Sequence, residues 1–237
     1  MTKEEAEAKR QEKLWKERER VAGMRRFEQE AVRETLGERS AAVSAAENSA
    51  VRGAVLICGI DEAGRGPLAG PVAAGACILP EDHDILWIND SKKLSAKKRE
   101  ELYDVITKEA IAWGVALASP ERIDEINILQ ATYEAMREAV RGLAVRPDVL
   151  VNDAVTIPGL DFPQVPIIRA DAQCLSVAAA SILAKVARDR LMQEADLQYP
   201  EYGFAQHKGY GTKAHIEAIR RYGPCPIHRR TFITHFC

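Results

Sequence analysis

An apolar run at residues 54–60 leads directly into an acidic and glycine-rich segment at residues 61–70, which reads DEAGRGPLAG. A short apolar run that contains β-branched residues and is closed by glycine predicts a buried β-strand rather than a helix. We therefore expect Asp61 and Glu62 at the exit of this strand. Neighbouring strand residues point to opposite faces, so both carboxylates reach one site only where the strand bends or ends.

The glycines that follow suit a functional loop. Gly64 and Gly66 flank Arg65, and glycine allows the backbone N–H groups to approach a ligand closely. Surface turns have a similar composition, but here the acids end an apolar strand, which favours a functional site. A phosphate-binding loop fits less well, because the segment lacks the Lys-Ser/Thr ending of a P-loop and the spacing of a dinucleotide-binding fingerprint.

Length, charge and cysteine content narrow the class of protein. A chain of 237 residues with 46% hydrophobic content can bury one full core, with room for a small second unit. The formal net charge of −2 means that nucleic-acid binding would depend on local basic clusters. The five cysteines form no C-x-x-C pair, which favours free thiols. The sequence contains no apolar stretch of membrane-spanning length and no signal peptide, so we expect a cytoplasmic protein.

Hydrophobic periodicity predicts the order of the remaining elements. Two adjacent strands, expected to be antiparallel, are followed by alternating strands and helices, and this order predicts an α/β sheet with helices on its faces. The expected strands are residues 54–60, 71–79, 110–118, 149–152 and 165–168, and the expected helices are residues 96–109, 120–141 and 175–197.

The first 50 residues differ in composition from the rest. Residues 3–39 are dense in Lys, Arg and Glu, and they predict one amphipathic helix, or a pair broken near Gly23, that ends by Gly37. Residues 40–52 have the composition of a linker. A solvated extension is favoured over a helix that packs on the body or on a partner. The apolar positions of the expected helix are Leu14, Val21, Met24, Phe27, Val32 and Leu36.

Two further acids follow predicted strands. Asp153 comes after the strand at 149–152, and Asp171 comes after the strand at 165–168. An isolated acid at a strand end is more often a cap or turn residue, but four such carboxylates at one end of a sheet would repel one another and need cations. Oxygen ligands select Mg²⁺ or Mn²⁺ over zinc. Two such ions about 4 Å apart can supply a nucleophilic water and stabilise a leaving oxygen, which predicts a metal-dependent phosphodiesterase.

Six segments, in this order, resemble the type 2 ribonucleases H, and together they cover residues 54–233. They read DEAGRGPLAGPVAAGACIL, DSKKLS, VNDAVTIPG, ADAQCLSVAAASILAKVARDR, HKGYGT and PIHRRTF. The resemblance implies a ribonuclease H-like fold with a mixed five-stranded sheet flanked by helices. It divides the chain into a charged helical extension and linker at 1–52, a catalytic domain at 53–197, and a small helical substrate-binding portion at 198–237.

The same resemblance implies roles for individual residues. The metal-binding and catalytic acids would be Asp61, Glu62, Asp153 and Asp171, with Mn²⁺ or Mg²⁺ as the cofactor. Asn152 departs mildly from the family pattern, so the alignment of the adjacent Asp153 with the family's acid is slightly less exact.

Substrate-binding roles follow in the same way. Gly64, Arg65 and Gly66 match a motif whose backbone meets the ribose 2′-OH, the group that separates RNA from DNA. Tyr210 matches a tyrosine that packs where RNA passes into DNA. The positions near substrate phosphates would be Lys92, Lys93, Ser181 and Lys185.

Three other basic residues have two interpretations each. Arg188 and Arg190 suit either backbone contacts to the substrate or solvated helix charges. Arg229, in the segment HRR, suits either a family signature or a structural role in closing the fold.

The implied activity is that of an endonuclease. It would hydrolyse the RNA strand of RNA–DNA hybrids and nick duplex DNA on the 5′ side of an embedded ribonucleotide, leaving 3′-hydroxyl and 5′-phosphate ends, as ribonucleotide excision repair requires. We expect a monomer without a membrane partner. The alternatives are ribonuclease H type 3, in which a lysine typically replaces Arg65, and a non-catalytic nucleic-acid-binding protein on the same fold.

Overall fold

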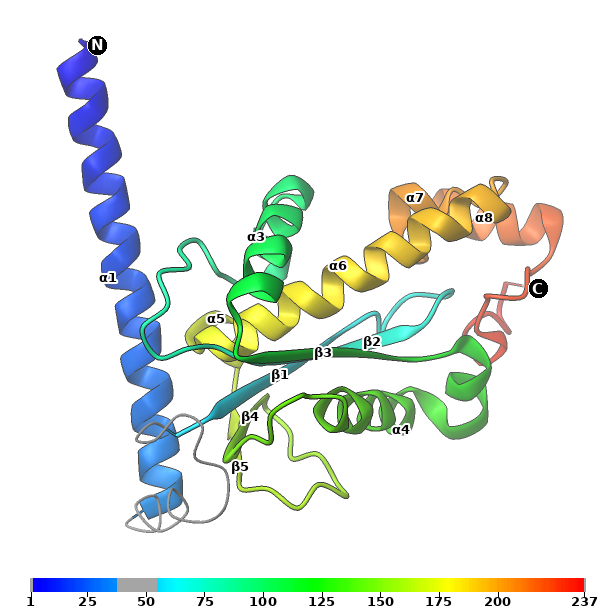
Figure 1. Ribbon diagram of the computed structural model, residues 1–237. Coiled ribbons are helices and arrows are strands. Elements are labelled where there is room, and N and C mark those ends of the chain that lie inside the picture. The colour runs from blue at the N-terminus through cyan, green and yellow to red at the C-terminus, as the bar shows by residue number, and fades with distance from the viewer. Residues whose placement is uncertain (1, 38–54, 237) are drawn as a thin grey trace.

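A computed structural model describes residues 2–37 and 55–236 of the protein. The linker expected at residues 40–52 lies outside the described residues. A five-stranded sheet in the order β3-β2-β1-β4-β5 forms the centre (Figure 1). Its strands are β1 (Ile57–Ala63), β2 (Val72–Ile78), β3 (Ala112–Ala118), β4 (Val149–Asp153) and β5 (Gln164–Ile167).

The strand directions confirm the expected mixed sheet. β1 pairs antiparallel with β2, and β2 pairs antiparallel with β3, whereas β4 runs parallel to both β1 and β5. The expected exit of the first strand is wrong by three residues, because β1 stays paired with β2 as far as Ala63. Asp61 and Glu62 therefore lie inside β1 and point to opposite sides of the sheet, as neighbouring strand residues do.

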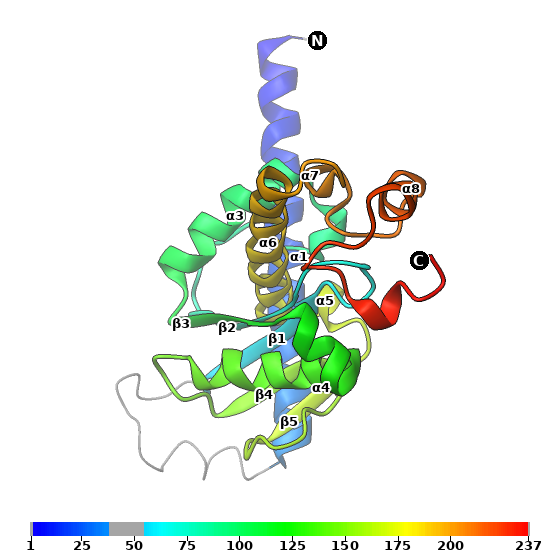
Figure 2. The ribbon, with the colours of Figure 1, turned by 90° about the vertical axis from the view of Figure 1, so that its right-hand side faces the viewer.

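Helices cover both faces of the sheet (Figure 2). One face packs against α3 (Ala96–Glu109) and α6 (Leu175–Gln198), and the other packs against α4 (Pro120–Arg141). Glycine makes the contact with α6 close: a Cβ on Gly59 would lie 2.0 Å from the carbonyl carbon of Ser176. The helix that carries much of the predicted substrate site is thus held tightly against β1.

The N-terminal segment forms one continuous helix, α1 (Lys3–Leu36), and it does not break at Gly23. Its N-terminal half projects beyond the rest of the molecule in Figures 1 and 2, while its C-terminal half packs on the body. The favoured interpretation as a solvated extension is therefore wrong for α1. Phe27, expected on the apolar stripe, is exposed. The buried positions are Glu17, Val21, Met24, Glu28 and Val32.

Shorter elements complete the chain. The C-terminal portion contains α7 (Phe204–His207) and α8 (Lys213–Tyr222), which pack around a small core that includes Phe204 and Ile219. The other short elements are η2 (Ser91–Lys93), α5 (Ala170–Gln173) and η3 (Arg230–Phe232). Over the described ranges, no helix combines the length and the apolar character needed to span a membrane.

Candidate active site

Asp61 lies on the face of β1 that α6 covers, and it is buried. Its Oδ1 accepts a hydrogen bond of 2.8 Å from the backbone N–H of Glu62. Burial, followed by the negative charges of Glu62 and Asp171, raises the pKa of Asp61 well above its usual range. A carboxyl in this position gains stability from any nearby cation.

β4 and α5 bring two further acids to the same place. Ile60 on β1 pairs with Asn152 on β4, so Asp153 follows in register beside Asp61. The Oδ1 of Asp153 accepts a hydrogen bond of 3.1 Å from the N–H of Ala170, at the start of α5. Asp171 occupies the first turn of α5, and the sequence prediction that it follows the strand is correct.

Asp61, Asp153 and Asp171 therefore lie near one another, and Asp90 joins them as an acid that the sequence did not predict. Glu62, on the other side of β1, is near enough for its charge to act on Asp61. Burial and then the charges of Asp90 and Asp153 raise the pKa of Asp171. The only cation within ion-pair distance of Asp171, among the residues the structure describes, is Lys92, whose Nζ lies 3.9 Å from Oδ2. Partial burial lowers the pKa of Lys92, and the surrounding carboxylates more than reverse that effect.

The donor set fits a hard divalent cation. Its side-chain oxygens are carboxylates, the ligand type that Mg²⁺ and Mn²⁺ prefer, and the mutual repulsion that raises the pKa values of Asp61 and Asp171 would be relieved by a cation. Within residues 2–37 and 55–236, no three His, Cys, Asp or Glu side chains are arranged as a metal-ligand set. Several of the acids instead accept hydrogen bonds from nearby protein groups. For example, Oε1 of Glu62 accepts a hydrogen bond of 3.3 Å from Nη1 of Arg65.

The glycine loop after β1 meets the HKGYGT loop, as the resemblance implied. A Cβ on Gly66 would lie 3.8 Å from Cε1 of Tyr210, and the N–H of Leu68 donates a 2.8 Å hydrogen bond to the carbonyl of Gly209. Tyr210 is 45% exposed. An aromatic ring in this position is available to a ligand that binds along the loop.

Arg188 on α6 joins the glycine loop and the HKGYGT loop by hydrogen bonds to both. It is fully buried, so the interpretation as a solvated helix charge is wrong. Its guanidinium donates to the carbonyls of Pro71, Lys208 and Ala69 at 2.9, 2.9 and 3.0 Å. Gly64 has φ +96°, and a Cβ there would lie 2.1 Å from Nε of Arg188, so this position requires glycine for both conformation and space.

Arg229 holds the glycine loop by hydrogen bonds to its backbone carbonyls. It is also fully buried, and it donates to the carbonyls of Gly70, Arg65 and Gly64 at 2.9, 2.9 and 2.6 Å. No carboxylate of the described chain lies within ion-pair distance of Arg229 or Arg188. Burial and repulsion from Arg188 lower the pKa of Arg229 to about 9, which leaves it charged at neutral pH. The structural role of Arg229 in closing the fold is thus evident.

Two buried histidines, His215 and His228, support the backbone of Tyr210. The N–H of Cys225 donates to Nδ1 of His228 at 3.0 Å, so Nε2 of His228 carries the proton and donates to Nε2 of His215 at 3.0 Å. His215 in turn uses Nδ1 to donate to the carbonyl of Tyr210 at 2.9 Å. Burial lowers the pKa of His215 and of His228 to about 4, so both rings are neutral near pH 7.

The remaining predicted substrate residues lie around this core. Lys93 is exposed on η2. Ser181 is buried, and its Oγ lies 2.8 Å from the Oγ of Ser91. Lys185 donates to Asp189 at 2.6 Å and lines, with Tyr210, a hollow of about 380 Å³ between α3, α6 and the HKGYGT loop. The substrate-binding roles of these residues stay predictions.

A family model described as "Ribonuclease HII" matches residues 58–235, which include every residue placed above. The chain belongs to the ribonuclease HII family. A relative from Lachnoclostridium phytofermentans, named ribonuclease HII, is 64% identical over 177 residues, which cover 75% of this chain and 70% of the relative. A ribonuclease HII from Clostridioides difficile is 53% identical over 197 residues, covering 83% and 77% of the two chains.

Solved structures give the same answer for the fold. The ribonuclease H2 of Pyrococcus horikoshii superposes with a TM-score of 0.62 at 31% identity, covering 74% of this chain and 92% of that one. As a ribonuclease HII, the protein is a metal-dependent endoribonuclease that acts on RNA–DNA hybrids. The alternative of a type 3 enzyme gives way to the type 2 family.

Sequence reasoning missed two features that shape the site of this ribonuclease HII, the acid Asp90 and the buried position of Arg188. Asp90 was present in the segment DSKKLS, but only its lysines suggested a role. Arg188 was open to a surface interpretation because arginine is rarely fully buried. Its one sequence signal was position, because it lies inside a segment that resembles the family and is rich in alanine and other apolar residues. For Arg229, the interpretation as a residue that closes the fold agrees with the structure.

Proposed function

We propose that this chain cleaves the RNA strand of RNA–DNA hybrids and also nicks duplex DNA on the 5′ side of a single embedded ribonucleotide. The observation that supports this proposal most strongly is the group of carboxylates from β1, β4 and α5, whose charges raise the pKa of Asp61 and of Asp171. They lie beside the glycine loop, in which Arg65 and Gly66 are exposed. The acids suit phosphodiester hydrolysis, and the glycine loop suits recognition of a ribose 2′-OH.

The acids take the catalytic role in this proposal. Asp61, Glu62, Asp153 and Asp171 would hold the divalent cations, Mn²⁺ or Mg²⁺, which supply an activated water and stabilise the charge on the leaving oxygen. In the reaction, the water oxygen bonds to phosphorus, the bond from phosphorus to the 3′ oxygen of the preceding nucleotide breaks, and that oxygen takes up a proton. The products carry a 3′-hydroxyl and a 5′-phosphate.

The substrate would lie across the two loops. Gly64, Arg65 and Gly66 would meet the ribose through their backbone, and the exposed ring of Tyr210 beside Gly66 would pack on the nucleotide at the junction. Lys92 is exposed and next to the acids, which suits a contact to a phosphate.

Other basic residues would hold the duplex outside the reacting nucleotide. Lys93 and Lys185 would serve the neighbouring phosphates. Ser181 would act from α6, where it is buried and its Oγ lies 2.8 Å from the Oγ of Ser91. Phosphate contacts of this kind position the duplex without reading its sequence.

The assembly expected for this activity is simple. One chain carries all of the acids and both loops, so we propose that a monomer suffices and that it works in the cytoplasm on nucleic acid. The charged extension, the catalytic domain and the C-terminal portion would act as one unit, because α1 and Arg229 of the C-terminal portion both contact the catalytic domain.

A direct test uses a duplex with one ribonucleotide, incubated with Mg²⁺, Mn²⁺ or EDTA. We expect a single nick 5′ of the ribonucleotide with either ion and none with EDTA. Asp61→Asn and Asp171→Asn should abolish cleavage. Asp161→Asn should not, because Asp161 is exposed and precedes the start of β5, at the opposite end of that strand from Asp153. Full activity of either of the first two variants with Mg²⁺ would overturn the assignment of the acids.

A further inference from the structure

The N-terminal helix α1 buries two glutamates against the body of the protein. Glu17 and Glu28 are 7% and 6% exposed, and eleven residues separate them, about 16 Å along a helix. Buried carboxylates are costly unless they are hydrogen-bonded. A helix that served only to cover apolar surface would be more stable with apolar residues at these two positions.

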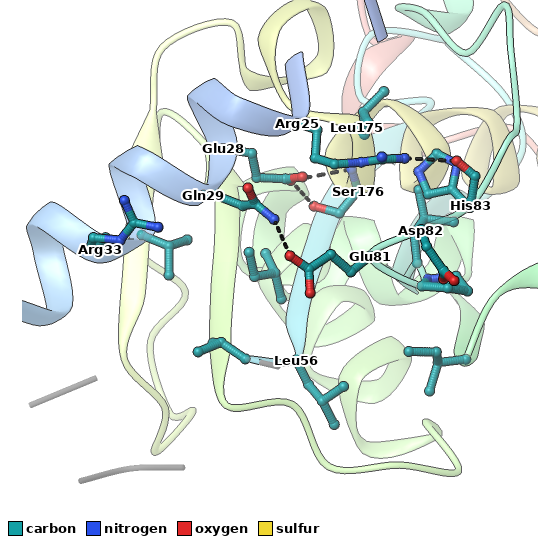
Figure 3. Close-up of a pocket in the computed structure, with 16 residues that line it drawn as sticks. Arg25, Glu28, Gln29, Arg33, Leu56, Glu81, Asp82, His83, Leu175 and Ser176 are labelled. Carbon is teal, nitrogen blue, oxygen red and sulfur yellow. Dashed lines mark hydrogen bonds between the residues drawn. The ribbon is translucent and has the colours of Figure 1, made fainter. Parts of the chain in front are cut away.

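Glu28 bonds to the start of α6. Its Oε1 accepts a hydrogen bond of 3.2 Å from the N–H of Ser176 and a shorter one from the Ser176 hydroxyl (Figure 3). α6 has no cap from its own sequence, because Cys174 occupies the N-cap position without a side-chain hydrogen bond. Glu28 therefore supplies from another helix the acceptor that an N-cap residue usually provides.

The junction that Glu28 caps also holds an acid of the site. Cys174 ends α5 and begins α6, and Asp171 lies in α5, three residues earlier. Val32 of α1 packs with Ala170 and Cys174 in the same cluster. The position of Asp171 thus depends on a junction that α1 both caps and packs against.

Glu17 bonds to the segment before Lys92. Its Oε1 accepts a 2.7 Å hydrogen bond from the N–H of Trp87, and its partner Arg20 donates to the carbonyl of Ile88 at 2.6 Å. Trp87 has φ +70°, a conformation that side chains rarely adopt and that persists only where neighbours hold it. Asp90 and Lys92, beside Asp171, follow within five residues.

We propose that Glu17 and Glu28 are positioning residues for the acidic site: α1 fixes the two segments that meet at Asp171, one carrying Lys92 and the other carrying Asp171 itself. This inference rests on the proposed role of Asp171 as a metal ligand. It makes the N-terminal helix part of the catalytic unit of this chain.

The test compares methionine variants of the full-length chain. Glu17→Met and Glu28→Met remove a buried acceptor at nearly constant length. Glu12→Met makes the same change at an exposed glutamate of the same helix, whose partner is Lys16, and serves as the matched control. Glu28→Gln keeps an acceptor oxygen for Ser176 and serves as the conservative rescue.

Two readouts separate positioning from general stability. The first is the Mn²⁺ concentration that gives half-maximal cleavage; we expect an increase of roughly tenfold for Glu28→Met, at most threefold for Glu28→Gln, and no change for Glu12→Met. The second is amide hydrogen exchange well below the melting temperature. Glu17→Met should speed exchange at Trp87, and Glu28→Met should speed exchange at Ser176, without a matching increase in α4.

The outcomes are distinct. If both methionine variants melt earlier but keep the wild-type Mn²⁺ dependence and local exchange, the glutamates only stabilise the fold and the inference is wrong. If Glu28→Met does not fold, Ser176→Ala removes one of the two contacts and should still raise the half-maximal Mn²⁺ concentration about threefold; no change there would equally refute it. Full activity of Asp171→Asn would instead refute the proposed function.

Discussion

Arg229 offers a sharp test of how the glycine loop is held. Nε, Nη1 and Nη2 of Arg229 each donate to a different carbonyl, those of Gly70, Arg65 and Gly64. Lysine keeps the charge and has three N–H donors, but they lie on one nitrogen that cannot occupy all three places, so we expect Arg229→Lys to lose two of these hydrogen bonds. A hydrogen bond to a charged group contributes about 1.5–3 kcal/mol, so we expect a loss of roughly 3–6 kcal/mol, reduced by whatever repulsion from Arg188 is relieved. For a chain of this size, that loss corresponds to a melting temperature lower by roughly 6–24 °C.

The assay for Arg229→Lys has a stability arm and a recognition arm. Thermal unfolding is compared with that of Arg230→Lys, a control at the adjacent, exposed arginine, which should melt within about 1 °C of the wild type. Binding without cleavage is then measured on an all-DNA duplex and on one with a single ribonucleotide. We expect the preference for the ribonucleotide to fall severalfold while DNA affinity changes little. A melting temperature within 2 °C of the wild type would show that these hydrogen bonds contribute far less than about 3 kcal/mol to stability.

Three further predictions address the acids, the loop and the histidines. Asp61→Asn should abolish cleavage and leave the melting temperature equal or higher, because it removes repulsion from Glu62 and Asp171; a strongly lowered melting temperature by calorimetry would contradict this. Tyr210→Ala should slow cleavage at a single ribonucleotide at least tenfold, since stacking contributes about 1–3 kcal/mol. Lys92→Ala should instead weaken binding to all duplexes and flatten the salt dependence of that binding. Equal effects of the two variants on cleavage rate and on affinity would argue against separate roles. The pKa of His228 is lowered to about 4 in the folded protein, so the unfolded chain takes up a proton first as the pH falls. The contribution of His228 to stability is therefore present above about pH 6.5 and is lost as the pH falls toward 4. Across that range, the melting temperature of His228→Gln should fall less than that of the wild type.

The sequence predicted most of the frame of the molecule. Periodicity placed the helices Ala96–Glu109 and Pro120–Arg141 at their observed bounds, because both bury one face on the sheet and have a serine cap at the start. It misjudged α1, since two of the five inward positions are glutamates, which a hydrophobic pattern counts as outward-facing. The hydrogen bonds that make those positions favourable come from Trp87 and Ser176, far along the chain.

The sequence predicted the group of acids but not the residues that surround them. Strand ends and resemblance brought together Asp61 and Asp153, and the parallel register of β1 and β4 agrees. Asp90 was not expected, because an acid in a short polar turn is usually only a cap, a role it also fills for η2. Its nearness to Asp171 depends on the path of the whole 80–90 segment, which no local pattern specifies.

The hydrogen bond from Arg229 to Gly64 joins residues 165 positions apart, and this separation has a consequence for biosynthesis. The glycine loop is translated early and receives its donor only after most of the chain has been made. Domains tend to fold from the N-terminal side during synthesis, but contacts of long sequence separation form late. A nascent or prematurely terminated chain that lacks Arg229 would have the acids of β1, β4 and α5 without the guanidinium that orders the glycine loop. Incomplete copies of the nuclease should therefore discriminate poorly between ribonucleotides and deoxyribonucleotides, and full selectivity should arise only once residue 229 has joined the fold.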